Sequence, residues 1–347
     1  MKNRKREICT SGSVRDEDGQ PPHLLGRRKF LHLAAGAAAL PVVLRVAWAQ
    51  TYPTRPVRII VGVGAGGAPD IVARLMGQWL SERLGQPFIV ENKPGAGTNI
   101  ATEAVVRAPA DGHTLLQATL TNAYNAALYP KLSFNFIRDI APISSIMRTP
   151  LVMVANPVFP AKSVPEFIAF AKANPGKINM ASSGAGNLTH LAGELFKMMA
   201  DVDIIHVPYR AAPLALTALL AGEVHVMFDP IGTSIENIRA GKLRALAVTT
   251  AARAPMLPDI RPMAEFVPGY EASGWQGVGA PRNTPDEIIE RLNQEINAGL
   301  ADPTLKGRLA SLGGVVFTNT PASFGTFISE ETEKWGKAIR AANIKLE

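Results

Sequence analysis

A short apolar strand that runs into a glycine-dense turn and then into a helix constrains this chain more than any other feature. The segment is Val57–Ile71, VRIIVGVGAGGAPDI. Glycines in such a turn let the backbone approach a bound group closely, and Pro69 stands where a first helical residue would sit. The free N–H groups at the start of the helix then make a local anion site. The residues of this turn expected to bind a ligand are Ala65, Gly66, Gly67 and Asp70, and Asp70 would contact an amine, a hydroxyl or a bridging water.

The same turn also matches a dinucleotide-binding fingerprint. The spacing Gly62-x-Gly64-x-x-Gly67 fits it, and Glu91 stands where such a fold would place its ribose-binding acid. Pro69 and the paired glycines argue against this interpretation, because they delay the start of the helix past the third fingerprint glycine. Glu91 can equally be a carboxylate at a strand end that bonds the neighbouring turn.

The first 49 residues have the pattern of an export signal. A twin-arginine core, Arg27-Arg28-Lys29-Phe30-Leu31, precedes the apolar run Leu33–Val43, which is too short to span a bilayer stably. Ala47-Trp48-Ala49 offers small residues at the two positions that a signal peptidase requires. We therefore expect residues 1–49 to be a twin-arginine signal peptide, and the mature protein of 298 residues to be soluble in the periplasm.

Charge and cysteine content argue against several classes of function. The chain has 36 Lys and Arg residues, of which nine lie before Gln50, and 29 Asp and Glu residues, of which four lie there. The mature protein therefore has 27 basic and 25 acidic side chains and a formal net charge near +2. No basic stripe interleaved with aromatic residues appears, so a nucleic-acid partner is not indicated. Cys9 is the only cysteine and lies in the leader, which excludes disulfides, thiolate chemistry and a cysteine metal site in the mature protein.

Apolar runs alternate with amphipathic segments almost throughout, which predicts parallel sheets with crossover helices. The predicted strands cover 58–61, 88–91, 114–118, 151–155, 178–181, 204–207, 224–228, 245–249 and 277–280. The predicted helices cover 71–84, 99–107, 164–173, 188–199, 214–220, 234–240, 285–300 and a tail from 321.

Two further turns repeat the first pattern. Ile178–Asn187 again joins a strand, a glycine turn and a helix start, and Val207–Pro213 carries a strand into a helix with proline in its first turn. Each turn lies at the carboxyl end of a predicted parallel strand, where ligands of open α/β sheets bind. Neither glycine turn contains Lys or Arg, so the two turns suit a carboxylate held by N–H groups without a salt bridge.

These residues resemble the tripartite tricarboxylate transporter substrate-binding family, the TctC-like or Bug receptors. The similarity runs from Tyr52 to the C-terminus. The matching motifs, in order, are YPTRP from Tyr52, GGAPD from Gly66, VENKPGAG from Val90, ADGHT from Ala110, SSGAG from Ser182, HVPYR from His206 and MFD from Met227. The resemblance implies an α/β, two-lobed, type II-like periplasmic-binding-protein fold, with mostly parallel sheets joined by crossing strands. The expected lobes are residues 50–151 with 277–347, and residues 152–276.

The resemblance also implies a monomeric receptor, not an enzyme, that closes on a small carboxylated ligand and delivers it to membrane permease subunits of a tripartite tricarboxylate-type transporter. No cofactor or metal is implied. It assigns the ligand to the first glycine turn and to residues from both lobes. These are Thr119, Asn122, Tyr124, Ser182, Ser183, Gly184, Gly186, Asn187, His190, Tyr209, Arg210, Ala211, Pro213 and Asp229, with Asn125 beside them. Family members often have Pro where Ala65 stands and Gly where Ala211 stands.

Several of these residues also have structural interpretations. Asp70 can interact with the N-terminus of its own helix, and Arg210 can pair with Asp229 inside the second lobe. His190 has no partner at metal-ligand spacing, and Ser182 lacks the surroundings of a hydrolase nucleophile. Trp275 is expected to pack where the lobes cross. The alternative function that stays open is an exported NAD(P)-dependent oxidoreductase with a Rossmann-like first lobe.

Overall fold

The computed structural model describes residues 52–129 and 131–344. The expected signal peptide, residues 1–49, lies outside the described residues. The described strands are β1 (Val57–Val61), β2 (Phe88–Asn92), β3 (Thr114–Thr119), β4 (Ile140–Ala155), β5 (Asn179–Ser182), β6 (Ile205–Pro208), β7 (Val226–Pro230), β8 (Arg244–Val248), β9 (Ser273–Pro281) and β10 (Val315–Val316). The helices are α2 (Ala68–Leu84), α3 (Asn99–Val106), α4 (Leu120–Leu128), α5 (Phe136–Asp139), α6 (Val164–Ala173), α7 (Leu188–Ala200), α8 (Ala212–Ala221), α9 (Ile231–Arg239), α10 (Asp286–Ala301), α11 (Pro303–Ser311) and α12 (Pro321–Ala341).

The strands form a ten-stranded sheet in the order β2-β1-β3-β9-β4-β7-β5-β6, with β8 and β10 also paired to β4. β1 pairs in parallel with β2 and β3, and β5 pairs in parallel with β6 and β7. The strands β1 and β5 lead into the two glycine turns, and each of them pairs in parallel with both of its neighbours. Every described pair made by β4 or β9 is antiparallel.

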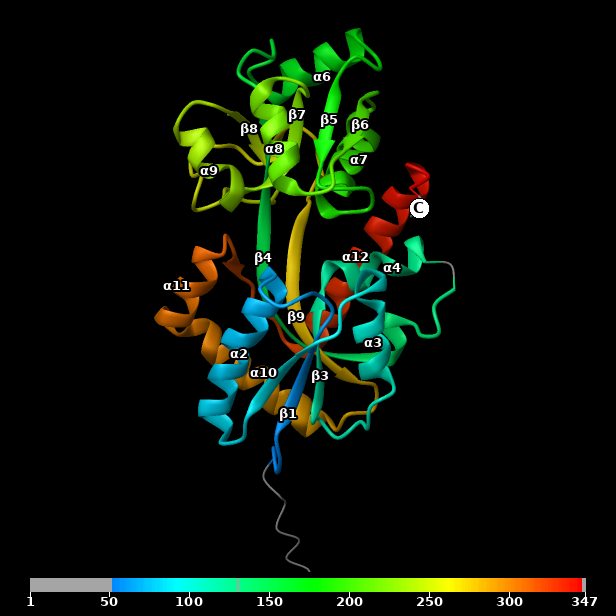
Figure 1. Ribbon diagram of the computed structural model, residues 1–347, viewed down its shortest axis with the longest axis vertical. Coiled ribbons are helices and arrows are strands. Elements are labelled where there is room, and N and C mark those ends of the chain that lie inside the picture. Colours follow the sequence, from blue (N-terminus) through cyan, green and yellow to red (C-terminus); the bar gives the residue numbers. More distant parts are fainter. Residues whose placement is uncertain (1–51, 130, 345–347) are drawn as a thin grey trace, which may run out of the picture. The chain divides into compact units, whose positions relative to one another are not determined.

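Two long strands join the two halves of the sheet. Residues Ile140–Pro150 of β4 pair with β9, and Leu151–Ala155 continue between β7 and β8. Figure 1 shows β4 and β9 running together from the part that contains β1 and β3 to the part that contains β5 and β7. The predicted two-lobed α/β fold with crossing strands is therefore confirmed. We call the part with β1, β2 and β3 the first lobe and the part with β5, β6 and β7 the second lobe.

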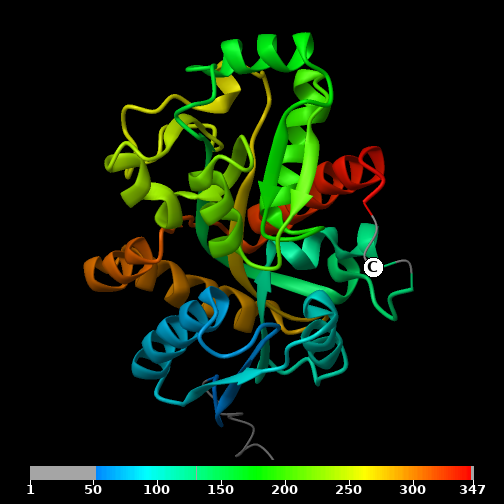
Figure 2. The same ribbon diagram turned by 45° about the horizontal axis from the view of Figure 1, so that its top comes forward.

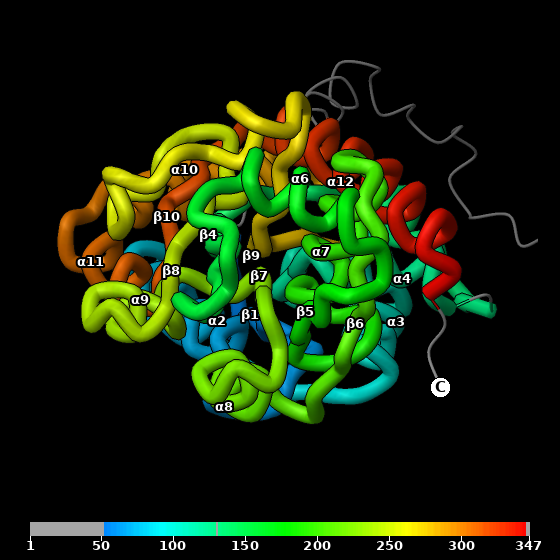
Figure 3. The backbone as a smooth tube through the Cα atoms, turned by 90° about the horizontal axis from the view of Figure 1, so that it is seen from above, coloured from blue at the N-terminus to red at the C-terminus, as the bar shows by residue number. Residues whose placement is uncertain are grey.

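Helices cover both faces of each lobe. In the first lobe, Met76 of α2 and Leu292 of α10 pack in one apolar cluster with β1. In the second lobe, Leu219 of α8 and Ile235 of α9 pack against one face of β4 and β7. A third cluster continues from lobe to lobe, because α12 contacts both α4 and α7, as Figures 2 and 3 show from two directions. None of the described helices is long and apolar enough to cross a membrane.

Local sequence signals fix several helix ends. The Ser163 side chain accepts a hydrogen bond from the Glu166 amide at the start of α6, and Asp302 caps α11 in the same way. Gly85 ends α2 with φ of 73°, a conformation that side chains disfavour. The ends at Ser163 and Gly85 lie where the sequence predicts helix boundaries, whereas the sequence analysis predicted no helix at α11.

Some elements differ from the sequence prediction. The helix after the first glycine turn begins at Ala68, so Pro69 is its second residue and not its first. Helix α4 was not predicted at all. Strand β4 begins at Ile140, eleven residues before the predicted start at Leu151, although it contains Pro142 and Pro150. Both prolines lie within the ladder to β9, whose register shifts beside Pro142 and absorbs the irregularity.

Candidate functional site

The two glycine turns have the backbone conformations that their sequences require. Gly66 has φ of 84°, and Gly184 and Gly186 have φ of 128° and 74°. These values lie in the left-handed region, where a branched side chain is strained. The helix after the first turn starts past Gly67, as predicted from Pro69 and the glycine pair. That start is too late for the dinucleotide fingerprint, in which the third glycine packs inside the helix.

A cleft of about 400 Å³ lies between the lobes, where these turns meet the crossing strands. Its walls come from the starts of helices in both lobes, and its floor comes from β4 and β9. The lining residues are Pro69, Thr119, Leu120, Thr121, Tyr124, Thr149, Ser183, Asn187, Leu188, Thr189, Pro230, Gly274, Trp275 and Gln276.

Four helices begin at this cleft. Pro69 is in the first turn of α2, Leu120 and Leu188 are the first residues of α4 and α7, and Pro230 caps α9. The first N–H groups of a helix have no partner inside the helix, and they carry the positive end of its dipole. None of the lining residues has a charged side chain. The cleft therefore offers donors and partial positive charge, which suits an anion.

Asp70 lies beneath the first turn and not in the cleft wall. Its side chain is 2% exposed, and it accepts hydrogen bonds from the Gly66 amide at 2.9 Å, from Arg74 and from Asn92. Burial alone would raise the pKa of Asp70, but these hydrogen bonds outweigh it and lower the pKa. Asp70 therefore stays ionised and stabilises the turn from within its own helix start, the structural interpretation weighed above.

A polar network that includes the buried Ser182 and His190 and the partly buried His206 supports the second turn. The His190 Nδ1 accepts the Gly186 N–H at 3.1 Å, and its ring stacks on that of His206 at 3.6 Å between centroids. The His206 Nε2 lies 2.6 Å from the Ser182 Oγ. Burial lowers the pKa of His206 to about 4, so the ring is neutral near pH 7. Ser182 and His206 are close enough for nucleophile and base, but Ser182 is fully buried. We therefore assign a structural role to this network, which holds the second turn in place.

Of the residues proposed from the sequence, Thr119, Tyr124, Ser183 and Asn187 line the cleft. Asn122 lies behind it, because its side chain accepts from the Thr119 amide at 2.7 Å and donates to Thr98 and Thr102. Its neighbour Asn125 likewise donates to the Gly97 carbonyl.

The third turn, predicted as part of the site, lies outside the cleft lining. Tyr209 packs against the second-lobe core, and Arg210, Ala211 and Pro213 are exposed. Asp229 is buried, and its carboxylate accepts from Thr233 and Ser234 of α9. Among the described residues Asp229 makes no ion pair with Arg210, so the predicted pairing of these two residues is wrong. The start of α9 provides hydroxyl partners for Asp229 instead.

Two other structural interpretations are confirmed. Glu91 pairs with Lys93 of the neighbouring turn at 2.8 Å and with Arg58, so it is engaged as a strand-end carboxylate. Trp275 lies on β9 opposite Arg148 of β4, where the lobes cross. Within residues 52–129 and 131–344, no group of three or more His, Cys, Asp or Glu residues is arranged to hold a metal ion.

The floor and part of the walls of the cleft consist of residues that were not predicted from the sequence. The missed residues are Pro69, Leu120, Thr121, Thr149, Leu188, Thr189, Pro230, Gly274, Trp275 and Gln276. First-turn residues such as Leu188 could have been found from the helix starts themselves. Thr149 and Gly274 gave no local signal, because their place depends on the pairing of β4 with β9.

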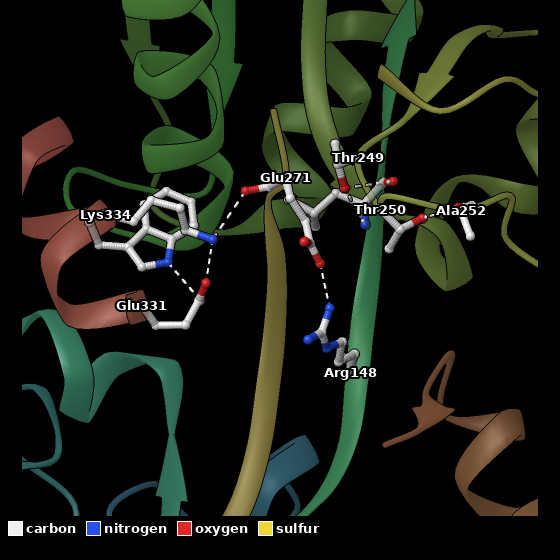
Figure 4. A network of polar contacts seen from close by, with 9 residues as sticks. Arg148, Thr249, Thr250, Ala252, Glu271, Glu331 and Lys334 are labelled. Atoms are coloured by element: carbon white, nitrogen blue, oxygen red, sulfur yellow. Dashed lines mark hydrogen bonds and ion pairs between the residues drawn. The ribbon is translucent and has the colours of Figure 1, made fainter. Parts of the chain in front are cut away.

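A polar network ties the crossing strands to α12, as Figure 4 shows. Arg148 of β4 forms an ion pair with Glu271, just before β9, and its guanidinium lies 3.9 Å from the ring centre of Phe317. Lys334 of α12 donates to the Glu271 carbonyl at 3.2 Å and pairs with Glu331.

A larger hollow, of about 910 Å³, lies elsewhere in the second lobe. It is lined by Phe159, Phe170 and residues that precede β5 and β7, such as Lys177 and His225. These are the amino ends of the parallel strands, whereas ligands of open α/β sheets bind at the carboxyl ends. No residue proposed from the sequence lies in this hollow, so the interlobe cleft is the better candidate.

Comparison with known proteins agrees with this geometry. The family model described as the tripartite tricarboxylate transporter family receptor matches residues 72–344. Protein BugT of Bordetella pertussis is 34% identical over 319 residues, which cover 91% of this chain and 96% of that protein. A UPF0065 protein from the tcbD-tcbE intergenic region of a Pseudomonas species is 35% identical over 319 residues, covering 91% and 94%.

Solved structures of similar proteins agree with the family match. A protein of R. palustris with adipate is 35% identical, with a TM-score of 0.70 over 85% of this chain and 100% of that one. MatC from Rhodopseudomonas palustris with bound malate is 32% identical, with a TM-score of 0.66 over 83% and 100%.

Fold and cleft together define a periplasmic solute-binding protein. The chain belongs to the tripartite tricarboxylate transporter receptor family. The predicted resemblance is thus confirmed, and the comparisons do not support the oxidoreductase alternative.

Proposed function

We propose that this protein binds a small carboxylate between its two lobes and delivers it to the membrane subunits of a tripartite tricarboxylate-type transporter. One observation carries the proposal: the interlobe cleft is lined by the first turns of α2, α4 and α7 and by the cap of α9, and no charged side chain lines it. Helix N-termini stabilise anions through directed N–H groups and the helix dipole. Two of the similar structures contain adipate and malate, and both molecules are carboxylates.

Binding is proposed to close the cleft. The lobes we propose comprise residues 50–151 with 277–347, and residues 152–276. Donors from both lobes can reach one ligand only when the lobes approach each other, so a ligand stabilises the closed state. The protein then acts as a receptor without bond chemistry and as a monomer.

A saturating carboxylate is expected to reduce the radius of gyration and to raise the melting temperature. At a hundredfold excess over the dissociation constant, the stabilisation is about 2.7 kcal/mol by mass action. The methyl ester of the same acid is expected to do neither, because the helix N-termini attract negative charge. Small-angle scattering and thermal-shift assays on a panel of acids and esters measure both effects. A protein that responds to nicotinamide nucleotides and to no acid contradicts the receptor function.

Export by the twin-arginine route is also part of the proposal. Arg27 and Arg28 precede an apolar run, and small residues stand at the expected cleavage point before Gln50. Replacing both arginines by lysine preserves charge, and it is expected to leave full-length precursor in the cytoplasm. Fractionation with immunoblotting tests this, and N-terminal sequencing tests cleavage after Ala49. Normal export of the double-lysine variant removes the twin-arginine assignment but not the receptor function.

A further inference from the structure

The hollow of about 910 Å³ in the second lobe has the composition of a ligand pocket. Its volume is more than twice that of the interlobe cleft, which is about 400 Å³. Its lining is mostly apolar, and the polar side chains are those of Asn156, Lys177, His225 and Lys242. A mostly apolar cavity of this size with a few polar groups is typical of small-molecule sites. The hollow is therefore a candidate for a second ligand.

Hydrogen bonds hold one wall of the hollow in place. The loop of residues 156–161 forms this wall, and the Arg244 guanidinium donates to three of its carbonyls at 2.9 or 3.0 Å. The Asn156 amide donates to two carbonyls at the end of α8, which joins the loop to that helix. The ring of Phe159 lies against that of Phe170 of α6, with 5.1 Å between centroids. These contacts fix the shape of the wall within the second lobe.

The charged groups that line the hollow are both basic. Lys177 precedes β5 and Lys242 precedes β8, and they flank one edge of the sheet, where β8, β4, β7 and β5 are neighbours. Within residues 52–129 and 131–344 neither lysine forms an ion pair. Glu223 stands between two lining residues in the sequence, but its side chain is not part of the lining. The hollow therefore attracts negative charge.

His225 adds a directed hydrogen-bond donor beside Lys177. The His225 Nδ1 accepts the Asn179 N–H at 2.8 Å, so in the neutral ring the proton is on Nε2. Burial lowers the pKa of His225, which favours this neutral form near pH 7. Nε2 makes no hydrogen bond in the part of the chain that the structure describes, and Asn179 is two residues from Lys177. An oxygen in the hollow can therefore accept from Nε2 next to the charge of Lys177.

We propose that this hollow is a second binding site, which takes an organic anion with an apolar body. The anionic group accepts from His225 and pairs with Lys177, and the apolar body covers Phe170 and Val158, whose side chain is otherwise 91% exposed. Every lining residue lies between residues 156 and 242, so the second lobe alone supplies the site. Figure 1 shows α6 at the end of this lobe that is remote from β1 and β3. Binding here therefore does not require the lobes to approach each other.

Two fluorescent probes that differ in one charged group test the proposal. Anilinonaphthalene sulfonate and phenylnaphthylamine share an aromatic body, and only the first carries a sulfonate. In Lys177→Met the sulfonate probe is expected to bind about fivefold more weakly, while the affinity for the neutral probe stays within about twofold. His225→Asn keeps an acceptor for the Asn179 amide and removes the Nε2 donor, so it is expected to weaken the sulfonate probe to a similar extent. Ala221→Trp fills the hollow and is expected to weaken both probes about tenfold or more.

Lys172→Met is the matched control for the loss of one charge. Lys172 is exposed on α6 of the same lobe and does not line the hollow, so this variant is expected to bind both probes as the wild type does. Small-angle scattering is expected to show no change in the radius of gyration with the sulfonate probe. Octanoate and naphthoate are expected to displace that probe, whereas their amides are not. The stronger of the two acids indicates whether the ligand has an aliphatic or an aromatic body.

The results that would overturn the second site do not bear on the interlobe cleft. Equal binding of the sulfonate probe by the wild type and Lys177→Met, or no saturable binding by the wild type, overturns the site. Equal weakening in Lys172→Met and Lys177→Met overturns it as well, because only the overall charge then matters. Displacement by the amides as readily as by the acids overturns the anionic class. The cleft is expected to bind its carboxylate unchanged in all of these variants.

Discussion

Replacing Gly184 or Gly186 by valine is expected to abolish carboxylate binding and to leave the fold intact. Both glycines have φ in the left-handed region, 128° and 74°, where a branched side chain costs about 1–3 kcal/mol. A Cβ at Gly184 would also lie 3.1 Å from the Asn187 side chain, which lines the cleft. The turn must therefore move, and its N–H groups and the start of α7 move with it. We expect affinity to fall about a hundredfold or more.

Gly222→Val is the matched control for this strain. Gly222 has φ of 78° at the end of α8, and the nearest atom to an added Cβ is the Asn156 amide at 3.6 Å. It lies at the 910 Å³ hollow and not at the cleft. Its valine variant is expected to lose stability to a similar extent and to bind the ligand normally. Unchanged affinity in both Gly184→Val and Gly186→Val, measured by calorimetry, removes this turn from the site.

The parts of the fold around the candidate site that sequence predicts well are those fixed by local backbone chemistry. A glycine turn between a strand and a helix start has few conformations, and Gly66, Gly184 and Gly186 of the two predicted turns have φ in the left-handed region. The alternation of strands and helices likewise predicted most elements of both lobes. Such signals depend on neighbours a few residues apart.

The parts that sequence does not predict depend on distant partners. Strand β4 passes through Ser144 and Ser145, which are fully buried although polar. The Ser145 hydroxyl donates hydrogen bonds to the Phe317 carbonyl and to the Asn319 side chain, more than 170 residues away in the sequence. No local pattern shows that a serine has such partners, so the first eleven residues of β4 read as a connection and not as a strand.

The direction in which a side chain points is the second feature that the sequence does not predict. Asn122 follows a strand end, as a ligand-binding residue would, yet its amide is turned inward to Thr98 and Thr102. Trp275 was expected only to pack, and it does pack against Phe324 and Phe327, but its indole nitrogen has no partner among the described residues. Both results depend on which helices cover the strand, which the sequence around each residue does not state.

Acid is expected to destabilise this protein through His206. Its pKa is lowered to about 4 from 6.5, by burial first and by the stacked His190 second. Glu194 and Lys197 stand on the same helix, with the Glu194 carboxylate 3.5 Å from His190 and 2.8 Å from Lys197. Between pH 6.5 and 4 the unfolded chain binds a proton here that the folded chain does not. The free energy of unfolding therefore falls as the pH falls through this window.

The loss from His206 is expected to reach as much as about 3 kcal/mol at pH 4. Denaturant titrations of the wild type and of His206→Gln from pH 7.5 to 4 measure it, and the variant is expected to show a much flatter slope. Asp139→Asn is the control for acid effects in general. The pKa of Asp139 is lowered to about 2 by Arg138, so its stabilisation is lost only below pH 3.8. Equal slopes between pH 6.5 and 4 in the wild type and His206→Gln contradict the assignment of a neutral, partly buried imidazole behind the second turn.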